Sequence, residues 1–228
     1  MGEHAGGVIV VSGGGPAPVV VRARLPEGAA VVAADSGVDT ALTLGLHVDI
    51  AVGDFDSVSS AGLAAVEAAG AHVIRHPEAK DATDLVLALD VAAELLGDEP
   101  GEIVVVGAPA GRLDHLVAGI LALAAPALAR YTVRAHLGAA TVHVVHGPGG
   151  VAVDAPVGAT VTLLPVGGGT QAVRTEGLRY PLHREPLDAG TTRGVSNVVA
   201  ADGARVEVGK GTLLVVLPGD ETLDGGRP

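Results

Sequence analysis

The chain has 228 residues, of which 48% are hydrophobic and 18% charged, and this composition excludes a disordered protein. Its net charge of −12 argues against a nucleic-acid partner, because phosphate backbones are bound by clustered Lys and Arg. There is no cysteine, no signal-peptide pattern at the N-terminus and no apolar run long enough to span a bilayer. We therefore expect a cytoplasmic protein with no membrane partner.

Up to residue 138, short β-branched runs alternate with helix-length segments rich in Ala and Leu. The predicted buried strands are residues 8–12, 30–34, 49–53, 72–75 and 103–107. The predicted helices are residues 38–44, 61–69, 83–96 and 113–125. This alternation is typical of right-handed βαβ units, so residues 1–138 are expected to form a Rossmann-like α/β domain with a parallel sheet.

The third predicted helix has the clearest end signals. Asp81 and Thr83 offer side-chain oxygens that can cap its first turn, and Gly97 follows its last apolar residue. We expect this helix to begin near Thr83 and to end at Gly97.

From residue 139 the pattern changes to short strands separated by Gly- and Pro-rich turns. Strands are predicted at residues 142–145, 160–164, 205–208 and 213–217, and no segment has a helical period. The three glycines at 167–169 favour a hairpin turn over a phosphate-binding loop, because no helix follows them. Residues 139–228 are therefore expected to form a small all-β sandwich domain.

Acidic residues follow four successive strands of the predicted sheet. In chain order they are Asp35, Asp54, Asp56, Asp81, Asp84 and Asp114. Open parallel sheets bind ligands at the carboxyl ends of their strands, and these ends share one edge. Carboxylates gathered there repel one another unless a cation neutralises them, and Mg²⁺ with a polyphosphate suits oxygen-only ligands.

The acidic residues differ in how strongly they indicate function. Asp54 and Asp56 alternate along a segment that we expect to be extended, so both can face one ion. Asp81 alone is more typical of a helix N-cap. Asp35 and Asp114 are as typical of turns and caps as of a ligand site.

Three basic residues accompany the acidic ones. Lys80, one of two lysines, can neutralise phosphate as a mobile point charge or form a local ion pair. Arg112, after Gly111 and before a helix, suits a phosphate or a base edge. His115 either orients this loop or the nucleotide, or is structural.

In this order the motifs resemble the thiamine pyrophosphokinase family along nearly the whole chain. The resemblance rests on Gly53-Asp54-Phe55-Asp56-Ser57, Lys80-Asp81-Ala82-Thr83-Asp84, the loop 107–115, residues 176–182 and Gly194-Val195-Ser196-Asn197. It implies a diphosphokinase that uses Mg²⁺ and ATP to convert thiamine to thiamine diphosphate and AMP. It also implies a homodimer whose thiamine lies between the catalytic domain of one subunit and the sandwich of the other.

The resemblance also implies roles for individual residues. Catalytic roles fall to Asp54, Asp56, Asp81 and Asp84, and the metal ligands among them are Asp54, Asp56 and Asp84. The nucleotide-binding residues are Asp35, Lys80, Thr83, Gly111, Arg112, Asp114 and His115. Thiamine contacts fall to Ser196 and Asn197. Ala110 stands where the family loop commonly has Gly, and no Trp is present to stack on thiamine.

Three other functions remain open at this point, and one of them is a nucleotide sensor without catalytic activity. A related diphosphokinase would act on a pterin alcohol instead of thiamine. A Mg²⁺-dependent phosphohydrolase would use Asp54 as a nucleophile, because Asp-Phe-Asp-Ser after a strand suits an aspartyl-phosphate enzyme.

Overall fold

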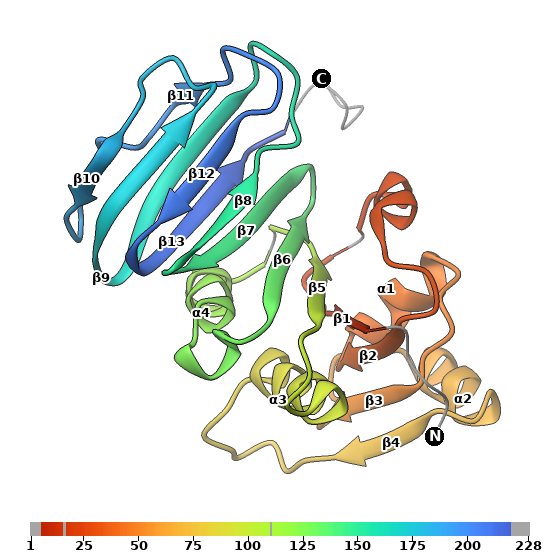
Figure 1. Cartoon of the computed structure of the whole chain (residues 1–228). Coiled ribbons are helices and arrows are strands. Elements are labelled where there is room, and N and C mark those ends of the chain that lie inside the picture. The colour runs from red at the N-terminus through yellow and green to blue at the C-terminus, as the bar shows by residue number, and fades with distance from the viewer. Residues whose placement is uncertain (1–5, 16, 110, 220–228) are drawn as a thin grey trace. The chain divides into compact units, whose positions relative to one another are not determined.

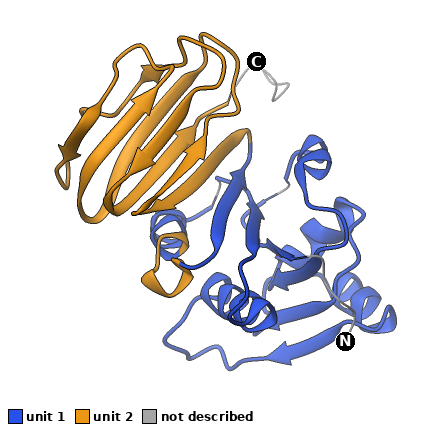
Figure 2. Cartoon of the chain, in the orientation of Figure 1, with its two compact units in different colours: residues 1–122, 130–138 blue, residues 123–129, 139–228 orange. Residues whose placement is uncertain are grey.

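A computed structural model describes residues 6–15, 17–109 and 111–219. The N-terminal residues 1–5, which lack a signal-peptide pattern, lie outside this part, as does Ala110. The chain divides into two compact units (Figure 2): unit 1 contains residues 1–122 and 130–138, and unit 2 contains residues 123–129 and 139–228. Within the described ranges, no helix has the length and apolar character needed to cross a membrane.

Unit 1 contains a parallel sheet. Its strands are β1 (Gly7–Val11), β2 (Ala30–Ala34), β3 (Ile50–Gly53), β4 (His72–Arg75), β5 (Glu102–Gly107) and β6 (Thr132–Leu137). They lie in the order β4-β3-β2-β1-β5-β6, and each neighbouring pair is parallel. The parallel α/β core and all five predicted strands are confirmed, except that β4 is not buried as expected. The strand β6 was not predicted. The strand order reverses at β1, which lies between β2 and β5.

Four α-helices follow these strands. They are α1 (Gly37–Thr43), α2 (Ser60–Ala68), α3 (Asp84–Leu96) and α4 (Leu113–Leu123). Two short 3-10 helices that the sequence did not predict are η1 (Val19–Arg24) and η2 (Pro126–Leu128). The cap of α3 is Thr83, whose Oγ1 accepts a hydrogen bond from the Val86 amide at 3.4 Å, and the helix ends at Gly97 with φ 61°. Both predicted ends of α3 are therefore confirmed.

The sheet of unit 1 is buried on both faces. Ile9 and Val11 of β1 pack in one cluster with Val38 of α1 and Val66 of α2. Successive side chains of a strand point to opposite faces, so Val8 faces the other side. There α3 packs against β1, β2 and β3 (Figure 1). Because helices cover both faces of the sheet, the sequences of its central strands β1, β2 and β5 are almost continuously apolar.

Unit 2 is built from antiparallel strands. They are β7 (Ala140–His146), β8 (Gly149–Ala152), β9 (Thr160–Glu176), β10 (His183–Leu187), β11 (Asn197–Val198), β12 (Arg205–Val208) and β13 (Lys210–Leu217). Their order is β7-β13-β9-β12-β8, and β10 and β11 also pair with β9. From residue 139 onward, the described residues form no helix, as the sequence predicted.

The glycines at 167–169 do not form the expected hairpin turn, because β9 continues through them. Gly167 and Gly168 have φ values of 69° and 151°. The register with β13 shifts between Val166 and Gln171, which marks a bulge. Glycine's freedom at positive φ thus bends a continuous strand here instead of ending it.

One glycine holds α1 against the end of β1. A Cβ added at Gly37 would lie 2.1 Å from the Val11 carbonyl oxygen, so the helix and strand approach as closely as a bare backbone permits. Because Asp35 lies two residues before Gly37, this contact also fixes the start of the loop after β2.

We predict that Gly37→Ala lowers the free energy of unfolding by about 1–3 kcal/mol, because backbone on both sides must shift. Gly70→Ala is the control, since an added Cβ there meets nothing within 4 Å and only its φ of 95° opposes the change. Urea denaturation measures both. A Gly37→Ala variant as stable as the wild type would show that the close approach does not matter.

Candidate active site

Three carboxylates meet at the carboxyl edge of the unit 1 sheet. Asp35 directly follows β2, Asp54 directly follows β3, and Asp84 is the first residue of α3. A Cβ at Gly53 would lie 3.1 Å from Asp84 Oδ1 and 3.2 Å from Asp35 Cβ. The missing side chain at Gly53 therefore leaves room for Asp35 and Asp84 on either side of the end of β3.

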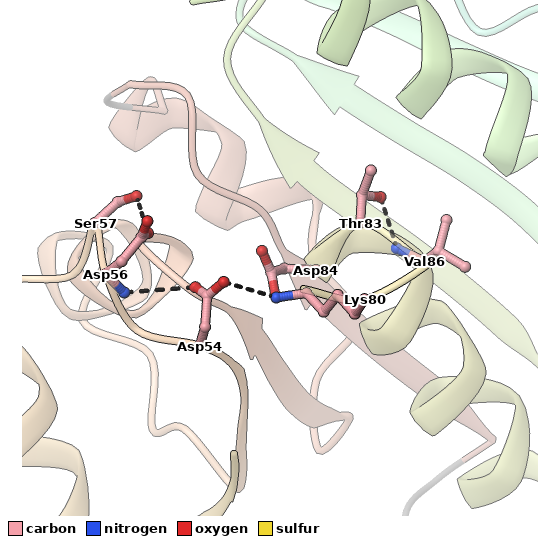
Figure 3. Close-up of polar contacts among 7 residues, drawn as sticks. All are labelled: Asp54, Asp56, Ser57, Lys80, Thr83, Asp84 and Val86. Atoms are coloured by element: carbon pink, nitrogen blue, oxygen red, sulfur yellow. Dashed lines mark hydrogen bonds and ion pairs between the residues drawn. The ribbon is translucent and has the colours of Figure 1, made fainter. Parts of the chain in front are cut away.

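Lys80 links two of these carboxylates (Figure 3). Its Nζ lies 2.8 Å from Asp54 Oδ2 and 3.0 Å from Asp84 Oδ1. Only 13% of the Lys80 side chain and 15% of that of Asp54 are exposed. The hydrogen bond from Lys80 is the main cause that lowers the pKa of Asp54, and Asp54 in turn raises the pKa of Lys80. Lys80 thus forms the local ion pair that was one of its two interpretations.

A second group of oxygen atoms lies beside this ion pair. Asp35, Asp54 and Asp56 each offer one carboxylate oxygen, and the three atoms lie within 4.8 Å of one another. Asp35 is buried, and its Oδ1 has no hydrogen-bond donor among the residues that the structure describes. A buried carboxylate oxygen without a partner is unfavourable. Mg²⁺ prefers oxygen ligands, so this donor set fits that ion.

The segment between Asp54 and Asp56 is a turn and not the extended strand that we expected. Phe55 has φ 62°, and the Asp56 amide donates to Asp54 Oδ1 at 3.5 Å (Figure 3). The Arg75 guanidinium lies 5.1 Å from the centre of the Phe55 ring, a cation–π contact that holds this left-handed residue. The turn brings Asp54 and Asp56 to the same group of oxygens, so the expected convergence has a different geometric cause.

Asp81 and Thr83 have separate roles in the loop before α3. Thr83 is the N-cap, so Asp81 is not. Asp81 is exposed and, in the described ranges, its carboxylate makes no hydrogen bond or ion pair. Its side chain is therefore accessible to a ligand.

The residues after β5 form an exposed pair of their own. Arg112 donates from Nε to Asp114 Oδ1 at 3.1 Å and from Nη2 to Asp114 Oδ2 at 2.6 Å. This pairing lowers the pKa of Asp114 to about 2 and raises the pKa of Arg112. Gly111, with φ 89°, and His115, in the first turn of α4, are exposed beside this pair.

Ser196 and Asn197 lie in unit 2, where they differ in accessibility. The Asn197 side chain is buried; its Oδ1 accepts from the Tyr180 and Val198 amides, and its Nδ2 donates to the Tyr180 carbonyl at 2.8 Å. Ser196 is exposed, with φ 58°, and its amide donates to Thr162 Oγ1. Asn197 therefore positions the backbone around Tyr180, while the Ser196 hydroxyl faces solvent.

Comparison with known proteins places both halves of the chain in one family. Residues 23–134 match the family model of the thiamin pyrophosphokinase catalytic domain, and residues 142–213 match that of its vitamin B1 binding domain. Thiamine pyrophosphokinase of Bacillus subtilis is 27% identical over 187 residues, which cover 81% of this chain and 85% of the relative.

Solved structures agree with these matches. The crystal structure of thiamine pyrophosphokinase from Bacillus subtilis has a TM-score of 0.79 at 26% identity and covers 93% of this chain and 99% of that one. That of thiamin pyrophosphokinase from Geobacillus thermodenitrificans has a TM-score of 0.76 at 27% identity, with coverage of 94% and 99%. These matches identify the protein as an ATP-dependent diphosphotransferase. The chain belongs to the thiamine pyrophosphokinase family, whose members transfer a diphosphate group from ATP to thiamine.

The sequence placed Asp35 at the same edge as Asp54 and Asp56, but the resemblance gave it a nucleotide role and not a place in this group of oxygens. A usable signal was present, because Asp35 and Asp54 each come directly after a predicted strand. What the sequence lacked was the order of the strands, in which β2 and β3 are direct neighbours. Neighbouring parallel strands bring the residues that follow them to the same place.

The ion pair of Lys80 predicts how stability depends on pH. The pKa of Asp54 is lowered from its usual 3.8, so its contribution is present above that value and is lost as the pH falls through the lowered pKa. We expect Lys80→Met to lose less stability than the wild type between pH 7 and about pH 3. In the variant Asp54 has no ion pair with Lys80, so its protonation breaks no stabilising interaction.

Urea denaturation at both pH values measures this difference. Lys210→Met is the matched control, because it removes the only other lysine from an exposed position in unit 2. Equal acid sensitivity in Lys80→Met and the wild type would contradict the role of the ion pair.

Proposed function

We propose that the carboxyl edge of the unit 1 sheet binds Mg²⁺ and ATP for diphosphate transfer to the hydroxyl of thiamine, with release of AMP. The observation that carries this proposal is the group of oxygens from Asp35, Asp54 and Asp56, in which Asp35 is buried and has one carboxylate oxygen without a hydrogen-bond partner among the described residues. In this proposal residues 1–138 act as a Rossmann-like catalytic domain and residues 139–228 as a β-sandwich domain that binds thiamine. The family matches favour thiamine over a pterin alcohol.

Asp35, Asp54 and Asp56 are the residues that we propose hold the metal. The resemblance assigned this role to Asp84 instead of Asp35; we prefer Asp35 because its oxygen lies in the three-oxygen group with Asp54 and Asp56. An Mg²⁺ ion held there would neutralise charge on the phosphate oxygens during transfer. Asp84 then serves to position Lys80.

Lys80 is proposed to contribute the mobile positive charge of the site. Its ammonium carries three donors, of which one is hydrogen-bonded to Asp54, while Asp84 forms an ion pair with it. A polyphosphate bound beside these carboxylates offers further oxygen acceptors to the same ammonium. The carboxylates of Asp35, Asp56 and Asp81 are the candidates to accept the proton of the attacking hydroxyl, and those of Asp56 and Asp81 are exposed.

The loop after β5 is proposed to bind the nucleotide. Arg112, Asp114 and His115 are exposed there, and Gly111 at positive φ has no side chain to obstruct a ligand. Without a ligand, the Arg112 guanidinium forms two hydrogen bonds to the Asp114 carboxylate within the loop. Nucleotide binding would therefore exchange this exposed ion pair for contacts to phosphate or base. Thr83 contributes by fixing the first turn of α3.

Thiamine contacts are proposed for Ser196, with Asn197 as a positioning residue. Ser196 is exposed. The Asn197 side chain instead forms hydrogen bonds with the backbone of Tyr180 and Val198 through its oxygen and one of its N–H groups. Tyr180 is the only aromatic residue after residue 138, and its ring is exposed. Replacing Asn197 would thus disturb the Tyr180 segment in addition to any ligand contact.

We predict that Asp56→Asn lowers formation of AMP and thiamine diphosphate by roughly 100-fold or more, since the metal loses an oxygen ligand. Asp56 is exposed, so the free energy of unfolding should stay within about 0.5 kcal/mol of the wild type. Separation of the products after incubation with Mg²⁺, ATP and thiamine measures the transfer. Asp90→Asn, an exposed change on α3, is the control for loss of one negative charge.

Two outcomes would contradict the proposal. The first is wild-type turnover of Asp56→Asn at saturating Mg²⁺. The second is wild-type protein that releases inorganic phosphate from ATP without forming a diphosphate ester, which indicates a phosphohydrolase.

A homodimer is also part of the proposal. Leu113, Val117 and Leu121 of α4 are 73%, 48% and 53% exposed, and their spacing of four places them on one face of the helix. An exposed apolar stripe of this kind is typical of a surface that pairs with another chain, and closed dimers pair such surfaces by a two-fold axis.

We expect Val117→Asp to convert the dimer to a monomer, because a carboxylate in an apolar contact is unfavourable. Light scattering coupled to size exclusion reports the mass in solution. Leu95→Asp is the matched control, since it places the same charge on an exposed apolar residue of α3. A wild-type monomer, or equal dissociation of both variants, would refute the assignment of this face.

A further inference from the structure

Unit 2 contains a second site of concentrated charge, apart from the carboxylate group. A pocket of about 320 Å³ is lined by Arg174, Arg184 and Arg205 together with Glu207. The lining therefore carries three positive side chains and one negative one in a chain whose net charge is −12. All of these residues belong to β9, β10 and β12 of one unit.

The floor of the pocket is made by glycine. Gly149 and Gly150 of β8 line it, and β8 pairs with β12 through Gly150 and Glu207. A Cβ at Gly150 would lie 3.1 Å from Glu207 Cγ and 3.4 Å from Arg205 Nη2. Two successive glycines thus leave open the space into which the charged side chains of the neighbouring strand extend.

Arg184 reaches the pocket through a strained backbone. It is the extra residue of a bulge, because His183 pairs with Arg174 and Glu185 pairs with the next residue, Val173. Its φ of 64° lies in the left-handed region, which is unusual for a long side chain. Bulges redirect side chains, and strain of this kind is concentrated at functional sites.

Arg184 also has no counter-charge. Among the residues that the structure describes, its guanidinium makes no ion pair or hydrogen bond. The adjacent Glu185 is engaged by Arg193, which is the main cause that lowers the pKa of that carboxyl. The acidic residue next to Arg184 on β10 is therefore already paired with Arg193.

The other two arginines keep free donors. Arg174 pairs with Glu176 through Nη2, and Arg205 pairs with Glu207 through Nε. Each guanidinium has five N–H donors, so most remain available to a ligand. Three guanidinium groups around one open pocket match the planar, multidentate recognition of phosphate oxygens.

We propose that this pocket binds a small molecule carrying a phosphate or diphosphate group. The ligand would lie over β9, which pairs with both β10 and β12, with Arg184 as its principal anchor and Arg174 and Arg205 as further donors. The pocket volume of about 320 Å³ is at the lower end of the range for small-molecule sites, so it suits a compact ligand. Because the site is built from unit 2 alone, it is separate from the carboxylate group of unit 1.

Calorimetric titration of the full chain with inorganic pyrophosphate tests the proposal. EDTA is present throughout, so that no divalent metal carries pyrophosphate to the carboxylates of unit 1. We expect one saturable site per chain, with an affinity that falls about tenfold or more in Arg184→Gln. Arg24→Gln is the matched control, because it removes the same charge from an exposed position in unit 1, and its affinity should stay within about twofold of the wild type.

Three results would overturn the proposal: no saturable binding by the wild type, unchanged affinity in Arg184→Gln, or an equal loss in Arg24→Gln. Circular dichroism verifies the fold of each variant, and Arg205→Gln replaces Arg184→Gln if the latter does not fold. Pyrophosphate binding by a chain that fails to form thiamine diphosphate would leave this inference intact while refuting the proposed function.

Discussion

The arrangement of unit 1 depends on one electrostatic constraint. A parallel sheet brings the residues after its strands to one edge, and here β2, β3 and the start of α3 bring carboxylates there. Lys80 neutralises only part of this charge, through Asp54 and Asp84. The oxygens of Asp35 and Asp56 lie close to that of Asp54, and because like charges at close range are unfavourable, this group favours the cation that we propose.

The same constraint connects the fold to the chemistry. Gly53 and Gly37 permit the close backbone approaches that place Asp35 beside β3, and the left-handed Phe55 turns Asp56 toward Asp54. Such a site holds its charges before the substrate arrives, which is the condition for electrostatic stabilisation of phosphoryl transfer. The ion pair of Lys80 and the proposed metal thus share Asp54, so each influences how strongly the other is held.

Much of the fold follows from the sequence because its signals are local. The apolar runs of unit 1 and the Thr83 and Gly97 ends of α3 are set by neighbouring residues, and the structure has them where the sequence indicated. The glycines at 167–169 could not be interpreted in this way, since a bulge and a turn require the same positive φ. The strands β7, β9, β12 and β13 of unit 2 lie where the sequence indicated, whereas β6, β8, β10 and β11 were not predicted and depend on pairing partners that are distant in sequence.

The site was predictable to the extent that strand ends identify it. Asp35, Asp54, Asp56 and Lys80 come after predicted strands, and Asp84 lies in the first turn of a predicted helix. That the oxygens of Asp35, Asp54 and Asp56 lie within 4.8 Å of one another depends on which strands are neighbours. The proposed metal site depends on this grouping. Titration of Mn²⁺ into the nucleotide-free protein, followed by electron paramagnetic resonance, tests it most directly. One bound ion per chain, weakened at least about tenfold in Asp35→Asn but not in Asp90→Asn, is the predicted result; equal binding by both variants would contradict it.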